Sequence, residues 1–289
     1  MSAPALGRST AWLVDTWARR TPDRPFLVWA PFEEPGRTWT RLEFARDVDA
    51  VAAGLHAAGT APGDRVALVL PNHPSFLLTW TAATTLGAVA VCLDPRLSRD
   101  ELAYALGHSS ARLVVTTPER ADDVALAAPG VRVVTDLDEL RRARPAAYPR
   151  AATWSDPASI QYTSGTTARP KAVVWTQANC LWAGQVGAVH QGLGAEDVYL
   201  VHLPLFHTNA LAYSFLPSLC AGGTVVLQPR FSARRFWSAA VDHRATWTSV
   251  VSFCLRALEG REVPRTTASA AGAAARSSPV PSPSSAGSG

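Results

Sequence analysis

Four hydroxyl side chains surround one glycine in the segment Tyr162–Lys171, which reads YTSGTTARPK. The hydroxyls belong to Thr163, Ser164, Thr166 and Thr167. Gly165 would let the backbone approach a ligand closely, and Lys171 would place a positive charge at the end of the segment. Proteins hold phosphate groups with backbone N–H groups in a tight concavity, with small hydroxyls and with a cationic side chain. The pattern therefore predicts a phosphate-binding loop.

Two other interpretations of this segment were weighed. It is not a Walker A loop, because Pro170 precedes the lysine where that loop has glycine, and Ala172 follows where it has serine or threonine. A Ser/Thr-rich hairpin turn with a chance lysine is the remaining alternative. Lys171 is the only lysine among 27 Lys and Arg residues, so a chance lysine at this position is less expected.

The composition is that of a globular chain and argues against several partners. Of the 289 residues, 47% are hydrophobic and 17% are charged, which allows a sizeable core. No apolar run reaches the roughly 18 to 20 residues that span a bilayer, and no secretory signal is apparent. Half of the net charge of +4 comes from residues 261–289, and the other arginines are scattered apart from a few pairs. We therefore expect a cytoplasmic protein with neither a membrane nor a nucleic-acid partner.

The cysteines are far apart and show no C-x-x-C spacing. They are Cys92, Cys180, Cys220 and Cys254. This spacing favours reduced, mostly buried thiols over a disulfide framework, and it predicts no metal site.

Apolar runs of strand length alternate with helical patterns up to about residue 260. We expect strands at residues 65–70, 89–93, 112–116, 131–135, 160–163, 172–176, 198–202, 224–227 and 246–251. We expect helices at residues 41–58, 75–86 and 98–108, after Pro118, at residues 177–191, 210–220 and 231–243, and from 253 onward. Capping boxes at Thr40–Glu43 and Ser98–Glu101 predict two helix starts. Because the strands are continuously apolar, we expect an α/β fold with mostly parallel, helix-covered sheets.

Two boundaries divide the chain. The Pro- and Arg-rich stretch Arg141–Pro149 predicts a connector, so we expect two sheet-forming segments, residues 1–150 and 151–260. Residues 261–289 are expected to be a disordered, low-complexity tail, because the last 25 residues hold no Leu, aromatic or acidic residue. A frameshift is favoured as the origin of this tail over a natural flexible end, since GC-rich codons read out of frame give such a composition.

The segment Tyr162–Lys171 resembles the signature YTSGTTxxPK of the adenylate-forming (AMP-binding) superfamily. The resemblance extends over about residues 10–260. It includes Pro71-Asn72, Asp94-Pro95, Thr176-x-x-Asn179, the LPLFH string Leu203–His207, and Ala221–Gly223. Within the superfamily, Asp197–Leu200 and Phe231–Trp237 are most similar to acyl-CoA ligases of the carnitine and crotonobetaine type.

This resemblance implies the N-terminal part of an acyl-CoA synthetase that uses ATP, Mg and CoA. Such enzymes join a small carboxylic acid to AMP with release of pyrophosphate, and a thiol such as CoA then displaces AMP. The resemblance places Thr163–Thr167 and Lys171 at the β- and γ-phosphates. It places His207 beside the acyl and adenylate pocket, although a purely structural role for His207 stays open. No residue is assigned to the chemical step itself.

Two features weaken the expectation of activity. Ala168 stands where the superfamily usually has Gly or Ser, and Ala172 stands where it usually has Gly. If either position needs a positive φ, alanine there would stiffen the loop. The superfamily's later YGxTE segment, its ribose-binding Asp, its hinge and its C-terminal catalytic lysine are not found in the sequence. We therefore expect no turnover from these 289 residues. The second hypothesis is a non-catalytic remnant that binds nucleotide weakly or acts as an interaction module.

Overall fold

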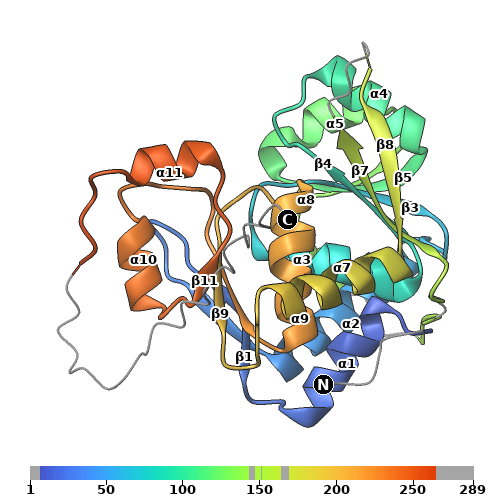
Figure 1. Ribbon diagram of the computed structural model, residues 1–289. Coiled ribbons are helices and arrows are strands. Elements are labelled where there is room, and N and C mark those ends of the chain that lie inside the picture. The colour runs from blue at the N-terminus through green and yellow to red at the C-terminus, as the bar shows by residue number, and fades with distance from the viewer. Residues whose placement is uncertain (1–6, 143–146, 151, 164–168, 265–289) are drawn as a thin grey trace, which may run out of the picture.

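The computed structural model describes residues 7–142, 147–150, 152–163 and 169–264. Their strands form two sheets (Figure 1). The first sheet has the order β11 (Trp247–Thr248), β9 (Val198–Val201), β10 (Thr224–Leu227), β1 (Pro25–Trp29) and β2 (Arg37–Thr40). The second sheet has the order β6 (Arg132–Val134), β5 (Ala111–Thr116), β3 (Arg65–Val69), β4 (Val89–Leu93), β7 (Pro157–Thr163) and β8 (Lys171–Thr176). Neighbouring strands are parallel except for the pairs β1–β2 and β7–β8. The α/β fold with two mostly parallel sheets is thus confirmed.

The connector suggested that the strands before residue 150 would form one sheet and those after it the other. The strands are not divided in this way. β1 precedes that point but pairs with β10, and β7 follows it but pairs with β4 through Ala90↔Ser159 and Cys92↔Gln161. The physical reason is hydrogen bonding. A buried central strand needs partners along both of its edges, and the nearest partner in space need not be the nearest in sequence. Each sheet therefore contains strands from both sides of the connector.

Helices cover both faces of each sheet (Figure 1). On the first sheet, α10 (Phe236–Asp242) packs on one face, and α11 (Ser252–Leu258) lies beside it. On the second sheet, one face carries α4 (Arg99–Ser109), the short turn η1 (Pro118–Arg120) and α5 (Ala121–Ala127). The remaining helices share the interior side of both sheets. They are α1 (Thr10–Arg20), α2 (Arg41–Ala57), α3 (Pro74–Leu86), α6 (Leu137–Arg142), α7 (Gln177–His190), α8 (Thr208–Ala210), the π-helical turn η2 (Leu211–Phe215) and α9 (Leu216–Ala221).

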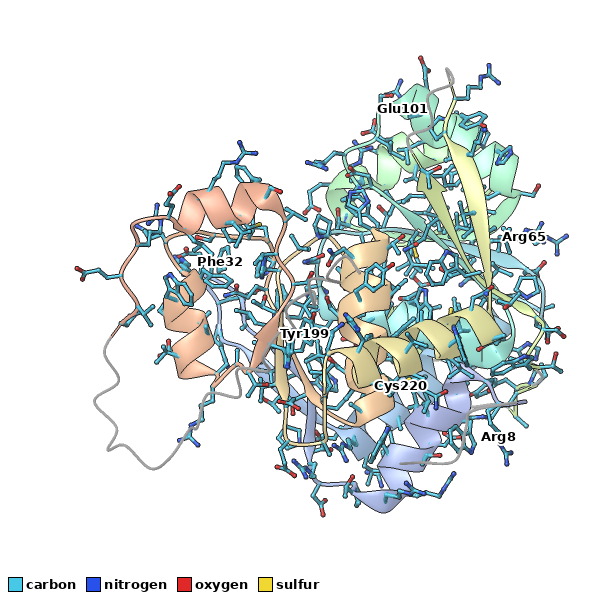
Figure 2. The ribbon with its side chains drawn as sticks, in the orientation of Figure 1. Arg8, Phe32, Arg65, Glu101, Tyr199 and Cys220 are labelled. Atoms are coloured by element: carbon cyan, nitrogen blue, oxygen red, sulfur yellow. The ribbon has the colours of Figure 1, made fainter. Side chains whose placement is uncertain are left out.

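The helix starts follow the capping chemistry in the sequence. The Thr40 hydroxyl accepts a hydrogen bond from Glu43 N at 3.1 Å, and Glu43 Oε2 accepts one from Thr40 N at 2.8 Å. Ser98 and Glu101 make the same reciprocal pair at the start of α4, where Glu101 lies on the surface (Figure 2). Each pair satisfies two backbone donors that a helix start leaves free. Both predicted capping boxes are confirmed.

One buried helix joins the two sheets into a single core. All of α3 except Ser75 is buried, and Trp80 is fully enclosed at 0% exposure. Trp80 packs edge-on against Phe215 of η2, with ring centroids 6.1 Å apart. The same apolar cluster contains Leu27 of the first sheet and Leu68 of the second. The two sheets therefore bury their apolar surface together.

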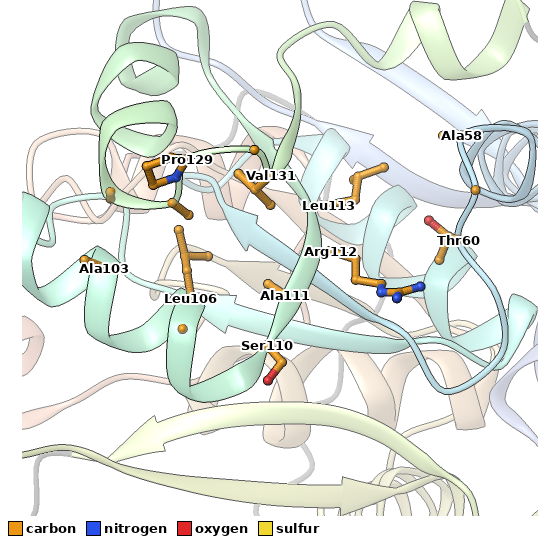
Figure 3. A pocket seen from close by; sticks show the side chains of 15 residues that line it. Ala58, Thr60, Ala103, Leu106, Ser110, Ala111, Arg112, Leu113, Pro129 and Val131 are labelled. Carbon is orange, nitrogen blue, oxygen red and sulfur yellow. The ribbon is translucent and has the colours of Figure 1, made fainter.

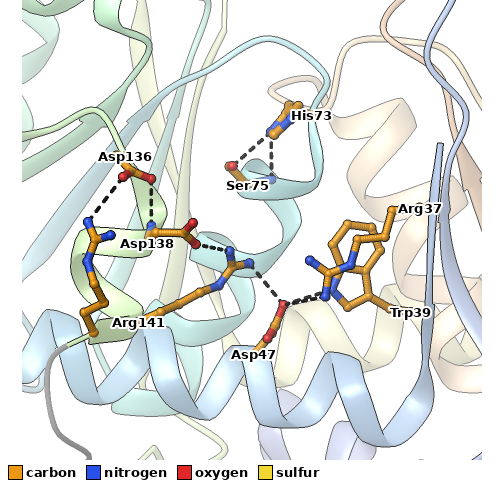
Figure 4. Close-up of polar contacts among 9 residues, drawn as sticks. Arg37, Trp39, Asp47, His73, Ser75, Asp136, Asp138 and Arg141 are labelled. Atoms are coloured by element: carbon orange, nitrogen blue, oxygen red, sulfur yellow. Dashed lines mark hydrogen bonds and ion pairs between the residues drawn. The ribbon is translucent and has the colours of Figure 1, made fainter. Parts of the chain in front are cut away.

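A polar network (Figure 4) holds α6 against α2, together with a close backbone contact at Gly54. Asp47 of α2 accepts hydrogen bonds from Trp39 Nε1 at 2.8 Å and from Arg141 Nη2 at 3.0 Å. Gly54 faces the backbone of Leu140, where a Cβ would come within 2.6 Å of the carbonyl carbon. Only glycine fits at this contact, because real Cβ atoms do not approach other heavy atoms so closely.

Several sequence predictions at the chain's two ends were incomplete. The elements α1, β1 and β2 were not predicted, since their patterns are short and mix polar with apolar residues. The helix expected from Phe231 begins only at Phe236, and the strand expected at 246–251 is limited to Trp247–Thr248. The prediction of a disordered tail concerns mainly residues 265–289, which lie outside the described residues. Within the described residues, no helix is both long and apolar enough to cross a membrane.

Candidate functional site

The predicted phosphate segment joins two antiparallel strands at the end of the second sheet. Thr163 of β7 and Lys171 of β8 are register partners, and the Thr163 hydroxyl lies 3.5 Å from the carbonyl oxygen of Lys171. Both side chains are exposed. The structure therefore brings Thr163 and Lys171, the first and the last predicted phosphate contacts, together where β7 ends and β8 begins. The other predicted contacts lie outside the described residues; they are Ser164, Gly165, Thr166 and Thr167.

One face of this hairpin is attached to helix α4. The Tyr162 hydroxyl donates a hydrogen bond to the carbonyl of Ala105 at 3.0 Å. On the other strand, the Tyr104 hydroxyl donates to the carbonyl of Pro170 at 3.2 Å, and the Arg169 guanidinium lies 5.3 Å from the centre of the Tyr104 ring. These contacts attach both described ends of the segment, at Tyr162 and at Arg169–Pro170, to α4.

The opposite face of β7 contacts the turn that carries His207. Successive side chains of a strand point to opposite faces, so Gln161 points away from α4. It accepts a hydrogen bond from the Thr208 hydroxyl at 2.7 Å and lies 3.5 Å from the carbonyl of Phe206 through its Nε2. The hairpin and the segment around His207 are therefore direct neighbours, although 36 residues separate Lys171 and His207 in the sequence.

His207 lies at the start of the helical stretch that runs through α8, η2 and α9. Its backbone N–H donates to the carbonyl of Pro204 at 3.0 Å, and its carbonyl accepts from Leu211 N at 3.2 Å. The Phe206 and His207 rings lie 4.4 Å apart. Partial burial lowers the pKa of His207, the Asp94 carboxylate opposes this, and Arg96 adds to it. The imidazole is therefore neutral at pH 7, with part of the side chain open to solvent.

An ion pair just after β4 adds charge to this region. Arg96 binds Asp94 through Nε at 3.0 Å and Nη2 at 2.8 Å, and its backbone N–H also donates to this carboxylate at 2.9 Å. Burial alone would raise the pKa of Asp94, but the hydrogen bonds from Arg96 bring it below its ordinary value. The Arg96 side chain remains 78% exposed and can face an anionic ligand.

Sequence reasoning named neither Gln161, Thr208 nor Arg96 as part of the site. A usable signal was present, because all three follow or approach the carboxyl end of a parallel strand. Ligands of open α/β sheets bind at that edge. The ends of β4, β7 and β9 all lead into the region that contains Asp94, Thr163 and His207.

A cavity of about 590 Å³ lies elsewhere (Figure 3). Its lining includes Thr60, which precedes β3, and Val131, which precedes β6. It also includes Ala111, the first residue of β5. The cavity therefore opens at the amino ends of these strands, opposite to the hairpin, and it is no part of the candidate site. No group of three or more His, Cys, Asp or Glu side chains that could hold a metal ion occurs among the residues that the structure describes.

Curated relatives of the chain are acyl-CoA-forming enzymes. A feruloyl-CoA synthase of Amycolatopsis sp is 39% identical over 211 residues, which cover 73% of this chain and 43% of that protein. A crotonobetaine/carnitine–CoA ligase of Escherichia coli O139:H28 is 33% identical over 239 residues, covering 76% of this chain and 46% of the ligase. The chain thus spans less than half the length of these relatives.

Solved structures of related proteins share the fold. The N-terminal domain of FACL13 from Mycobacterium tuberculosis superposes with a TM-score of 0.77 and 28% identity, covering 86% of this chain and 64% of that domain. The o-succinylbenzoate CoA synthetase MenE of Bacillus subtilis, in complex with the acyl-adenylate OSB-AMP, gives a TM-score of 0.75 and 28% identity. That match covers 87% of this chain and 50% of MenE.

The family model described as AMP-binding enzyme matches residues 14–284. This match covers both sheets, the hairpin and the His207 turn, and it extends into the segment expected to be a tail. The resemblance noted in the sequence is confirmed. The chain belongs to the AMP-binding enzyme family, with acyl-CoA synthetases among its relatives.

Proposed function

We propose that the chain carries the phosphate-binding part of an acid–CoA ligase, which activates a small carboxylic acid with ATP and transfers the acyl group to CoA. The observation that carries this proposal is the pairing of Thr163 with Lys171 beside the His207 turn, in a chain of the AMP-binding family. In the first step a carboxylate oxygen attacks the α-phosphorus, and the bond to pyrophosphate breaks. In the second, the CoA thiol attacks the acyl carbon and AMP leaves.

The first step brings two anions together, so catalysis depends on positioning and charge neutralisation. In this proposal Thr163, Ser164, Gly165, Thr166, Thr167 and Lys171 hold the β- and γ-phosphates. A lysine at a hairpin mouth suits a phosphate, since a flexible ammonium group acts as a mobile point charge. His207 borders the acyl and adenylate pocket, and its neutral ring would not attract the departing pyrophosphate away from Lys171. Magnesium enters with ATP in this proposal and supplies further charge neutralisation.

The substrate class follows from the relatives. Feruloyl-CoA synthase and crotonobetaine/carnitine–CoA ligase are named for the acids that they join to CoA. Ferulate, crotonobetaine and carnitine are therefore the first acids to test. We place the protein in the cytoplasm with no nucleic-acid or membrane partner, in keeping with four free cysteines and scattered arginines.

The binding experiment uses calorimetry with MgATP on the full chain and on Lys171→Met. Charge-assisted hydrogen bonds contribute about 1.5–3 kcal/mol, so the variant should bind MgATP roughly 10- to 100-fold more weakly. Arg112→Met is the matched control, because Arg112 is 69% exposed and lies at the amino end of β5, away from the hairpin. Equal affinities of the chain and Lys171→Met would refute the assignment of Lys171.

A second candidate function is nucleotide binding without turnover, and it is kept because the relatives match over less than half of their length. Pyrophosphate release distinguishes the two candidates. Release that depends on one of the three acids supports the ligase proposal and overturns our expectation that these 289 residues do not turn over. MgATP binding with no release for any acid supports the second candidate.

A further inference from the structure

Two buried amide side chains from the second sheet hold the turn that carries His207. Asn72, just beyond β3, accepts a hydrogen bond from Leu205 N at 2.8 Å and donates one to the carbonyl of Leu203 at 2.9 Å. Gln161 of β7 contacts the next part of the turn through Phe206 and Thr208. The two amides are only 6% and 4% exposed. Every residue of the segment 203–208 except Pro204 and His207 is thus named in one of these contacts.

The two amides differ in what they connect. Asn72 binds only backbone groups, and its Nδ2 also lies 3.2 Å from the carbonyl of Gln228, after β10. It therefore ties the base of the turn to both sheets. Gln161 instead lies two residues before Thr163, on the strand that leads into the phosphate loop. Its hydrogen bond with Thr208 therefore links this end of β7 directly to the start of α8.

The hydrogen bond with Gln161 reaches the helical stretch α8–η2–α9 at its first residue. Thr208 is the first residue of α8, and its hydroxyl donates to Gln161, while the N-cap residue His207 makes no side-chain capping bond. The π-helical turn η2 follows at Leu211–Phe215. Wide turns of this kind inside helices often occur at functional sites, since their backbone hydrogen bonds are less regular. The helical stretch that begins at Thr208 is therefore irregular before α9 begins at Leu216.

We propose that Gln161 is a positioning residue that couples the phosphate hairpin to the His207 turn. Through its hydrogen bond with Thr208, the position of β7 sets the position of His207, so that phosphate binding at the hairpin orders the acyl side of the site. The link from phosphate binding to the acyl side of the site rests on the proposed function. The coupling between β7 and the His207 turn is a property of the chain without ligand.

Hydrogen–deuterium exchange on the full chain, without nucleotide, tests the coupling. The variants are Gln161→Met and Thr208→Val, which are close in shape to the native residues but lack this hydrogen bond. Losing one such bond should speed amide exchange by roughly 3- to 10-fold. We expect Thr208→Val to speed exchange across the contact, in residues 158–163 and 171–175, and Gln161→Met to speed it in residues 205–212. The double variant should match Gln161→Met, because that variant already lacks the bond that Thr208→Val removes.

Thr116→Val is the matched control. The Thr116 hydroxyl is buried and donates to the carbonyl of Val69 at 3.0 Å, but it touches neither the hairpin nor the turn. Faster exchange confined to the substituted element would overturn the coupling, and so would the same pattern in Thr116→Val. With MgATP added, native protein should show slower exchange at 205–212 and Gln161→Met should not. If native protein fails to bind MgATP, the proposed function fails while the ligand-free result still decides the coupling.

Discussion

A buried histidine should make the stability of this protein fall in mild acid. His202 follows β9, is 1% exposed, and packs against Phe231 and Phe236 with ring centroids 5.2 and 5.5 Å away. Its Nδ1 lies 3.5 Å from the Thr248 hydroxyl. Its Nε2 is buried with no hydrogen-bond partner in the described part of the chain. Burial lowers the pKa of His202 to about 4, because a charged ring would lose its hydration there.

The size and the sign of the effect follow from this pKa. In the unfolded chain a histidine has a pKa of about 6.5, so below that pH the unfolded state takes up a proton that the folded state refuses. The free energy of unfolding should therefore fall by about 1.4 kcal/mol for each pH unit below 6.5, to a total of about 3 kcal/mol near pH 4. Above pH 6.5 both states are neutral, and His202 adds no pH dependence.

Urea unfolding at pH 7.5 and pH 4.5 measures this contribution against His202→Leu, which cannot titrate. The difference in unfolding free energy between the native protein and the variant should shift by about 2–3 kcal/mol over this range, since the carboxylates are common to both chains. His190→Gln is the control for replacing a histidine as such, because His190 is exposed on α7. A difference that stays constant within about 0.5 kcal/mol would refute the reasoning.

Two further predictions concern packing and thiol reactivity. Gly54→Ala should destabilise the protein by about 1–3 kcal/mol, because its Cβ would overlap the Leu140 backbone. Gly107→Ala, on the open face of α4 with nothing within 4 Å, should stabilise it by up to about 1 kcal/mol; thermal unfolding that shifts in the same direction for both would contradict this contrast. Burial raises the pKa of the Cys92 and Cys220 thiols to about 12 and raises that of Cys180 further, and Cys254 is buried. Iodoacetamide at pH 8 should thus label the four cysteines only after unfolding, and rapid labelling of the native chain at any of them would count against burial as the cause.

Local chemistry made much of the fold predictable. The capping pairs at Thr40 and Ser98 act over three residues, so the sequence pattern contains all of their interaction. The apolar strands of the second sheet are predictable for a similar reason, since strands buried on both faces read as continuous runs. By contrast, β2 has only one of its four residues buried, and its place in the sheet is set by its antiparallel partner β1.

The candidate site was predictable only in part, because its parts interact at different ranges. The motif located the hairpin, and the register of Thr163 with Lys171 agrees with a strand–loop–strand arrangement. The contacts of Gln161 with Thr208 and of Asn72 with Leu205 span 47 and 133 residues. A single sequence does not indicate which buried amide faces which turn. Side chains that orient a site are therefore found from the structure rather than from the motif.

The interleaving of the two sheets has a consequence for dividing the chain. A cut within the connector Arg141–Pro149 would give one fragment with β1 and β2 but without β10, and another with β7 and β8 but without β4. Each fragment would hold strands whose partners belong to the other. The buried helix α3 lies in the first fragment, and its Trp80 packs against Phe215 of the second. Neither fragment could therefore bury its own apolar core. The two pieces would have to fold by binding one another, and the β7–β8 hairpin would regain its contacts with α4 and β4 only in the reassembled pair.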